Sequence, residues 1–108
     1  MKNTRLKNQI EFFEKLGNML NSGVPLQESL RILQAEMAQA GEIQREISSL
    51  LDRIDALTGE ANLFQEYPSQ TFGLSTTAML SAGEKHGQLD YVCIKIANCL
   101  RAELNNLG

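Results

Sequence analysis

Apolar residues recur along the chain at intervals of three and four positions, the spacing of one face of an α-helix. The first such stripe covers residues 6–20 and ends at Gly23, and the second covers 26–37 and is closed by Gly41. No segment alternates apolar and polar residues as a half-buried β-strand would. The pattern therefore predicts an all-α protein.

Four further helices follow by the same criterion. The predicted segments are 43–57, closed by Thr58 and Gly59; a short helix of about two turns over 63–67; a helix from an N-cap at Ser69 to about Glu84; and 89–104. The connections look short, roughly two to six residues, which favours antiparallel neighbours. The sequence therefore predicts an antiparallel six-helix bundle built from short-looped helical hairpins.

Two similar phrases, MLNSG at 19–23 and MLSAG at 79–83, each stand where a helix is predicted to end. Glycine is common just past a helix end, because it adopts the left-handed backbone conformation without strain. Pro25 follows the first phrase at a position that suits the start of a new helix. We therefore predict two helical corners, closed by Gly23 and Gly83.

Composition and charge narrow the classes of function. The chain has 108 residues, 43% of them hydrophobic, and a net charge of −3, which fits one domain with one core. That charge, without a basic recognition helix, argues against nucleic acid as a partner. Lys2, Arg5 and Lys7 form a small basic cluster, for which a solvated helix end is the simpler interpretation and anionic lipid the alternative. The longest uncharged stretch, 67–83, is too polar to span a membrane.

The two cysteines cannot bridge within one helix. Cys93 and Cys99 lie six positions apart on the last predicted helix, so their side chains point about 120° apart. Two half-buried free thiols fit a reducing compartment such as the cytoplasm.

The stretch GEKHGQLD at 83–90 gathers the groups most able to do chemistry. His86 is the single histidine of the chain and falls at a predicted corner, where it should be exposed. No motif positions a serine or cysteine nucleophile, so we predict no catalytic residue, no cofactor and no enzymatic activity. Glu84 and Asp90 remain weak candidates for Ca²⁺ ligands, since two carboxylates are few and no EF-hand spacing is present.

Helix-end electrostatics explain the same two carboxylates more simply. Asp90 falls in the first turn of a predicted helix, where a negative charge meets free backbone N–H groups. Glu84 stands at the end of the preceding helix and gains nothing from that helix's dipole. It therefore needs another partner, either amides of the following turn or a basic side chain on a neighbouring helix. We predict that Glu84 is a structural anchor; a docking residue for a partner protein is the second interpretation and a metal ligand is the third.

Two segments, FFEKLGNMLNSGVPLQESLRIL at 12–33 and MLSAGEKHGQLDYVCIKIANCL at 79–100, resemble a known family. They are similar to the signatures of the cytoplasmic domain repeated in inner-membrane platform proteins of type II secretion systems and type IV pili, the GspF/PilC family. The residues that match are Gly23, Pro25, Leu26, Ala82, Gly83, Glu84, Gly87, Leu89 and Asp90. The similarity spans about residues 10–104, is looser over 58–72, and departs from the usual family residues at His86 and Cys93.

The resemblance implies that residues 1–108 are one cytoplasmic helical-bundle domain, the first of two copies in a longer membrane protein. Such a domain would lie at the cytoplasmic face of the bacterial inner membrane and couple the secretion ATPase to pilin or pseudopilin assembly, beside other inner-membrane assembly proteins. Attachment to the membrane would use segments absent from this chain, beginning with an apolar stretch of ~20 residues soon after residue 108.

Two further expectations concern partners. The uncharged face around Leu74, Thr77, Ala78 and Ser81 favours a weak homodimer, because small side chains let helices approach closely. The competing class of function is a free-standing regulatory or adaptor bundle that docks a partner helix in a groove.

Overall fold

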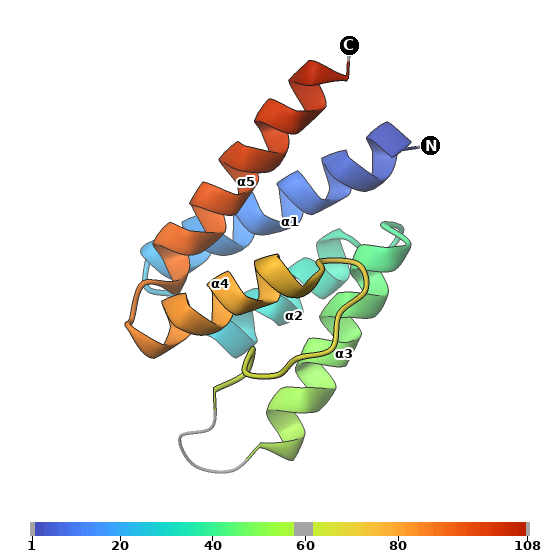
Figure 1. Cartoon of the computed structure of the whole chain (residues 1–108). Helices are drawn as coiled ribbons and strands as arrows, with labels where there is room; N and C mark the ends of the chain where they lie inside the picture. The colour runs from blue at the N-terminus through green and yellow to red at the C-terminus, as the bar shows by residue number, and fades with distance from the viewer. Residues whose placement is uncertain (1, 58–61, 108) are drawn as a thin grey trace.

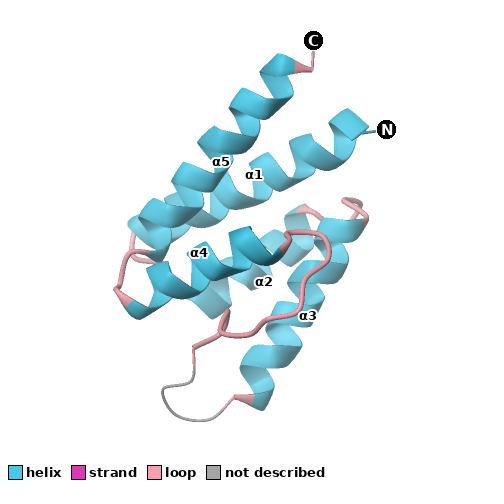
Figure 2. Cartoon of the chain, viewed as in Figure 1, coloured by secondary structure: helices cyan, strands magenta, loops and turns pink. Residues whose placement is uncertain are grey.

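The computed structural model of the chain describes residues 2–57 and 62–107, and its regular structure there is helical throughout (Figures 1 and 2). The helices are α1 (Lys2–Asn21), α2 (Leu26–Glu36), α3 (Glu42–Ala56), α4 (Leu74–Lys85) and α5 (Leu89–Asn106). No strand occurs in these ranges. The prediction of an all-α protein is confirmed, and four of the six predicted helices appear near their expected bounds.

The prediction of six helices is wrong, because residues 63–67 form turns instead of a helix. The apolar cluster is buried as expected, with Leu63 2% and Phe64 1% exposed. However, the backbone N–H groups of both residues donate to the Glu84 carboxylate, and the Leu63 carbonyl accepts from Arg53. Side chains of other elements therefore satisfy part of the backbone of this segment, and the described residues 2–57 and 62–107 contain five helices.

Ser69 does not begin the helix predicted after it. Its hydroxyl accepts a hydrogen bond of 3.0 Å from the N–H of Phe72, as an N-cap would. Gly73 then takes a φ of 85°, which ends this single turn, and α4 begins at Leu74. The connection from α3 to α4 thus covers 57–73 and contradicts the expectation of uniformly short loops; the predicted helix end at Thr58 and Gly59 lies outside the described residues.

The long helices α1 and α5 run antiparallel, with the two chain termini at the same end of the molecule (Figure 1). The α2–α3 hairpin packs on α1, and α4 packs on α5. The principal extents of the molecule are 45 × 27 × 27 Å.

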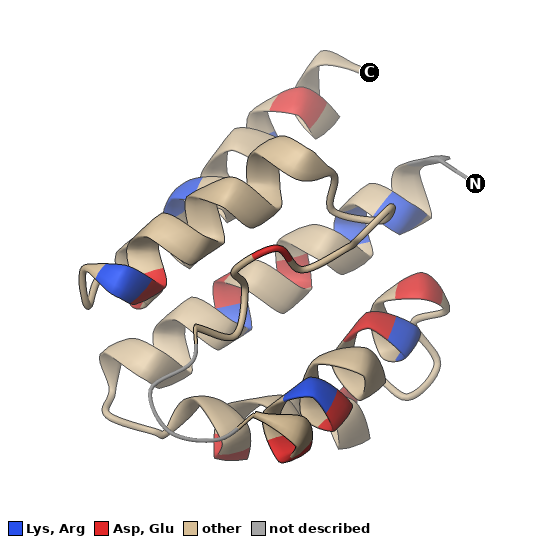
Figure 3. Cartoon of the chain, turned by 60° about the horizontal axis from the view of Figure 1, so that its bottom comes forward, with Lys and Arg blue, Asp and Glu red and all other residues tan. Residues whose placement is uncertain are grey.

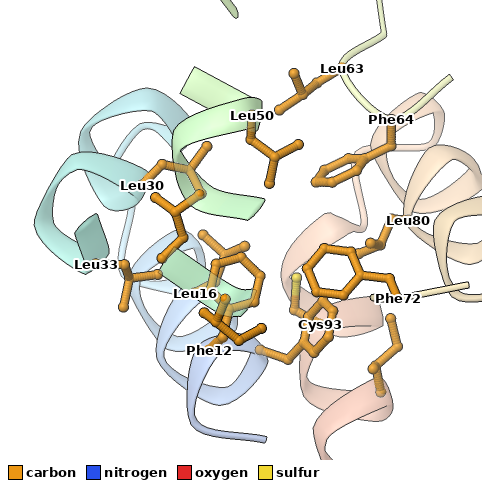
Figure 4. Packing of buried hydrophobic residues seen from close by; sticks show 14 of the residues in the cluster. Phe12, Leu16, Leu30, Leu33, Leu50, Leu63, Phe64, Phe72, Leu80 and Cys93 are labelled. Atoms are coloured by element: carbon orange, nitrogen blue, oxygen red, sulfur yellow. The ribbon is translucent and has the colours of Figure 1, made fainter. Parts of the chain in front are cut away.

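The apolar stripes of all five helices meet in one core, together with the connection before α4 (Figure 4). Phe12, Leu16, Leu30, Leu33, Ile47, Leu50 and Leu80 are fully buried. Phe72 of the connection stacks on Phe12 with ring centroids 5.8 Å apart. Burying such a side chain contributes roughly 1.5–3 kcal/mol, so Phe72 helps to hold the connection against the core.

Two helix contacts depend on glycine. A Cβ on Gly17 of α1 would stand 2.8 Å from the Ile94 side chain of α5, and one on Gly83 of α4 would stand 2.7 Å from Val92. Such distances are too short for carbon atoms, so both positions let α5 approach its neighbours closely.

Candidate functional site

The first corner joins α1 to α2 mainly through backbone hydrogen bonds, with one long side-chain bond of 3.5 Å from the Ser29 hydroxyl to the Val24 carbonyl. The N–H of Val24 donates to the Met19 carbonyl, the N–H of Gly23 donates to the Leu20 carbonyl, and Gly23 has a φ of 93°. This pattern is a Schellman motif with the glycine in the left-handed position. Pro25 then caps α2, and Leu26 opens it and packs against the core. The predicted corner at Gly23 and Pro25 is therefore present.

The second corner, between α4 and α5, repeats the motif four residues later than predicted. The N–H of Gln88 donates to the Gly83 carbonyl at 2.7 Å, and that of Gly87 donates to the Glu84 carbonyl. The left-handed glycine is Gly87, with a φ of 68°. Gly83 lies inside α4 and is buried, so the prediction that it closes the helix is wrong. Its structural counterpart in the first corner is Met19.

Glu84 ties this corner to the connection before α4. Its two carboxylate oxygens accept hydrogen bonds of 3.0 Å from the N–H groups of Leu63 and Phe64. Asn62 adds a bond from its side-chain amide to the Ser81 carbonyl at 3.1 Å. Backbone amides were among the partners expected for Glu84, but they come from the preceding connection instead of the following turn. Hydrogen bonds to a charged group contribute about 1.5–3 kcal/mol. The two bonds to Glu84 therefore contribute measurably to the stability of the fold.

Helix α3 holds the same connection from the other side. The Arg53 guanidinium donates to the Leu63 carbonyl at 2.6 Å and to the Gln65 carbonyl, and it lies 5.6 Å from the centre of the Tyr67 ring. Glu46 accepts from the Tyr67 hydroxyl at 3.0 Å and from the Ser69 hydroxyl at 2.8 Å. Burial, and then the Glu46 charge, raise the pKa of the Tyr67 hydroxyl, which therefore stays a proton donor. Residues 62–69 are thus fixed between two helices.

Between this connection and α4 lies an open groove of about 640 Å³. Its lining residues are Phe64, Glu66, Tyr67, Pro68, Leu74, Thr77, Ala78, Ser81, Ala82, Lys85 and His86. Leu74 is 86% exposed, the largest value among the exposed large hydrophobic residues. Figure 3 shows that α4 has no charged position before Glu84 and Lys85 at its end, whereas charges are frequent on α1 and α3. The groove is therefore a candidate surface for a protein contact.

The face predicted to self-associate is only partly on the surface. Leu74, Ala78 and Ser81 line the groove. Thr77 is 4% exposed, and its hydroxyl donates to carbonyl oxygens within α4, at Gly73 and Leu74. Thr77 therefore stabilises α4 and is not available for contact with a second copy of the domain.

The remaining groups of the 83–90 stretch have separate surroundings. His86 is exposed, as expected, and forms the C-cap of α4. Asp90 lies in the first turn of α5 and accepts from the N–H of Tyr91 at 2.8 Å. Leu89 opens α5 and packs on the core as Leu26 does in α2. Over residues 2–57 and 62–107 no group of three or more His, Cys, Asp or Glu side chains could hold a metal ion.

The two cysteines differ from each other. Both are free, with Cys93 buried and Cys99 exposed, where the sequence had suggested two half-buried thiols. Burial, with a smaller effect of Asp90, raises the pKa of the Cys93 thiol to about 12. Cys93 is therefore a core residue and an unreactive thiol near neutral pH.

Sequence reasoning missed Arg53, Glu46 and Asn62 as parts of this site. Each looks like an ordinary polar residue, and the partners that tie it to other elements lie 10 to 23 positions away in the chain. The buried aromatic cluster that they serve was visible, but the sequence contains no local signal for which side chains would hold it.

Comparison with known proteins gives one result. The family model described as "Type II secretion system (T2SS), protein F" matches residues 12–107. No curated protein and no solved structure matches the chain. The matched range includes both corners, the connection before α4 and the groove. No helix in the described part of the chain is long and apolar enough to cross a membrane.

Proposed function

Because the chain belongs to the family of type II secretion system protein F, we propose that it is a platform domain of a type II secretion or type IV pilus machine. In this proposal residues 1–108 form the first of two cytoplasmic domains of a longer inner-membrane protein. The domain couples the assembly ATPase to the addition of pilin or pseudopilin subunits and catalyses no reaction itself. The observation that supports the proposal most strongly is the family match over nearly the whole chain.

The chemistry of the second corner fits a scaffold. Both oxygens of Glu84 accept backbone N–H groups, and Asp90 accepts the N–H of its neighbour, so these carboxylates serve the fold. A general base needs a carboxylate that is free to reach a substrate. The features that match the family signature therefore support positioning of a partner instead of catalysis.

We propose that partners of the platform meet the groove along α4. Its wall at residues 64–68 is fixed by Arg53, Glu46 and Glu84, so little ordering is needed when a partner binds. A second copy of the domain is the occupant we propose for the isolated chain, because the exposed Leu74 and the uncharged part of α4 at residues 74–83 suit a self-complementary contact. In the cell the same surface is available to the ATPase or to another assembly protein.

The groove also supports the competing function, a free-standing adaptor that docks a partner helix. The two functions differ in the coding sequence beyond residue 108. A platform protein requires an apolar stretch of ~20 residues there, and an adaptor does not.

The proposed function is tested in the organism that encodes the chain. Removing residues 1–108 from the encoded protein abolishes secretion or piliation, and restoring them recovers it. Leu74→Glu folds, because that side chain is 86% exposed, but fails to restore function. Ile32→Glu, at a 38% exposed position of α2, is the control and restores function. Normal secretion and normal pili after removal of residues 1–108 would refute the proposal.

A further inference from the structure

One end of the molecule, formed by the first two turns of α1 and the last two turns of α5, has a composition unlike the groove. We propose that this terminal end contacts the headgroups of an anionic membrane surface. The inference rests on the proposed function, which holds the domain beside a bilayer.

The antiparallel packing of α1 and α5 puts these turns side by side (Figure 1). A shallow hollow of about 250 Å³ joins them and is lined by Arg5, Leu6, Gln9, Glu103 and Leu107. Residues about a hundred positions apart in the chain therefore share one surface.

This surface exposes an apolar side chain next to basic ones. Leu107 is 57% exposed and lies across the hollow from the half-buried Leu6. Arg5 lines the hollow, and Lys7 is exposed on the same turns of α1 but on another side of the helix, outside the hollow. Leucine beside arginine and lysine is the combination found where proteins lie on a bilayer, since the leucine enters the headgroup boundary while the cations meet anionic lipid.

The charges of the terminal end determine how strongly it is expected to bind an anionic membrane. A cation near an anionic leaflet raises the partition coefficient about fivefold. Arg5 forms an ion pair of 3.0 Å with Glu42, but the Arg5 side chain is 62% exposed, so a phosphate oxygen can replace that partner. Glu103 lines the same hollow and opposes binding. The isolated chain should therefore bind weakly.

Attachment makes such a weak contact effective. A membrane segment following residue 108 would continue from the terminal end, so the local lipid concentration there would be high. The contact then holds the terminal end of the domain against the bilayer.

The test measures partition of the 108-residue chain onto vesicles of equal parts phosphatidylglycerol and phosphatidylcholine, at low salt, with pure phosphatidylcholine as the comparison. We expect binding to the anionic vesicles only. Arg5→Gln with Lys7→Gln lowers the partition coefficient about 25-fold, and Glu103→Gln raises it about fivefold. If the double variant unfolds, Lys7→Gln alone gives a fivefold loss.

Two control variants make the same charge changes elsewhere. Arg31→Gln with Lys95→Gln alters exposed positions of α2 and the early part of α5, and Glu28→Gln alters the first turn of α2. Both leave partition within about twofold of the wild type. Equal effects of the two double variants, or no binding of the wild type, would overturn the inference.

The outcome separates the inference from the proposed function, because the vesicles contain no secretion machinery. Specific vesicle binding with normal secretion after removal of residues 1–108 would refute the proposed function alone. Loss of secretion on removal, without vesicle binding, would refute the lipid contact alone.

Discussion

The two corners of this domain have the same backbone motif but different support. At Gly23 and at Gly87 the helix ends in a Schellman motif with a left-handed glycine, and a leucine opens the next helix. The first corner is held by its own backbone bonds and by one local side-chain bond, from Ser29 to Val24. The second is also held by Glu84, which binds Leu63 and Phe64, and by the close approach of Gly83 to Val92.

This difference shows that one backbone motif can serve two purposes. The first corner only reverses the chain. The second organises the connection from α3 to α4, and with it one wall of the groove. Damage to the second corner should therefore spread to distant segments, and damage to the first should remain local.

The largest difference in stability between the two corners is expected when Gly83 and Gly23 are each replaced by valine. Gly83→Val should lower the free energy of unfolding by about 3 kcal/mol, because its Cβ would stand 2.7 Å from Val92. Gly23→Val has open space around it and costs only the left-handed strain, about 1–2 kcal/mol. Thermal melts measure both. If Gly83→Val melts at the wild-type temperature, the close α4–α5 contact is absent.

Glu84→Gln should cost about 2 kcal/mol, because a neutral amide offers one acceptor oxygen to two N–H groups. Asp90→Asn is the matched control at the same corner, and we expect less than about 0.5 kcal/mol, since its single bond is exposed.

The same melts with Ca²⁺ and with chelator examine the metal alternative. An anchor gives the same loss in both conditions. A loss that appears only when Ca²⁺ is present would favour a metal site at Glu84 and Asp90.

Alkaline pH should weaken the helix that follows the second corner. The pKa of the Cys93 thiol is raised from 9.0 to about 12 by folding, so its contribution to stability is complete below about pH 9 and is lost as the pH rises towards 12. Between about pH 8 and pH 10 the wild type should lose about 1.4 kcal/mol more than Cys93→Ala. Denaturant titrations at the two pH values measure this, and parallel losses would show that the thiol does not contribute.

The smallest loss of stability is expected for alanine at the left-handed glycines, the feature that the two corners share. Gly23→Ala and Gly87→Ala each place a Cβ in open space at positive φ, so each should cost about 1 kcal/mol. The two losses should agree within experimental error. Unequal losses would mean that the left-handed glycines are not equivalent.

The helices were predictable because their burial is periodic. The stripes from Leu6, Leu26, Ile43 and Leu89 each appear as a helix whose apolar side packs in the core. The family resemblance through the two corner segments was likewise confirmed by the match over 12–107.

The connection before α4 was not predictable from local pattern. Leu63, Phe64 and Tyr67 have helix-like spacing, but their backbone groups bind Glu84 and Arg53, which belong to other elements. Ser69 makes a cap-like hydrogen bond, yet Gly73 stops the turn. Tertiary contacts override local preference at residues 63–67, and the left-handed backbone of Gly73 ends the turn at Ser69.

The prediction that Gly83 closes a helix, which was based on the repeated phrase, was wrong for a different reason. MLNSG and MLSAG look equivalent, but the left-handed residue of the second corner is Gly87, four positions further on. Gly83 is required because α5 approaches it, and that contact depends on Val92 in the next helix. A glycine in a sequence does not reveal whether backbone conformation or close packing requires it.

Amide hydrogen exchange in the wild type and in Glu84→Gln tests most directly the claim that the second corner anchors the distant connection. We predict that the amides of Leu63 and Phe64 are protected in the wild type and exchange about 10- to 30-fold faster in the variant. The amides of Val24 and Ser29, at the first corner, should keep their rates. Equal protection of Leu63 and Phe64 in both proteins would contradict the account.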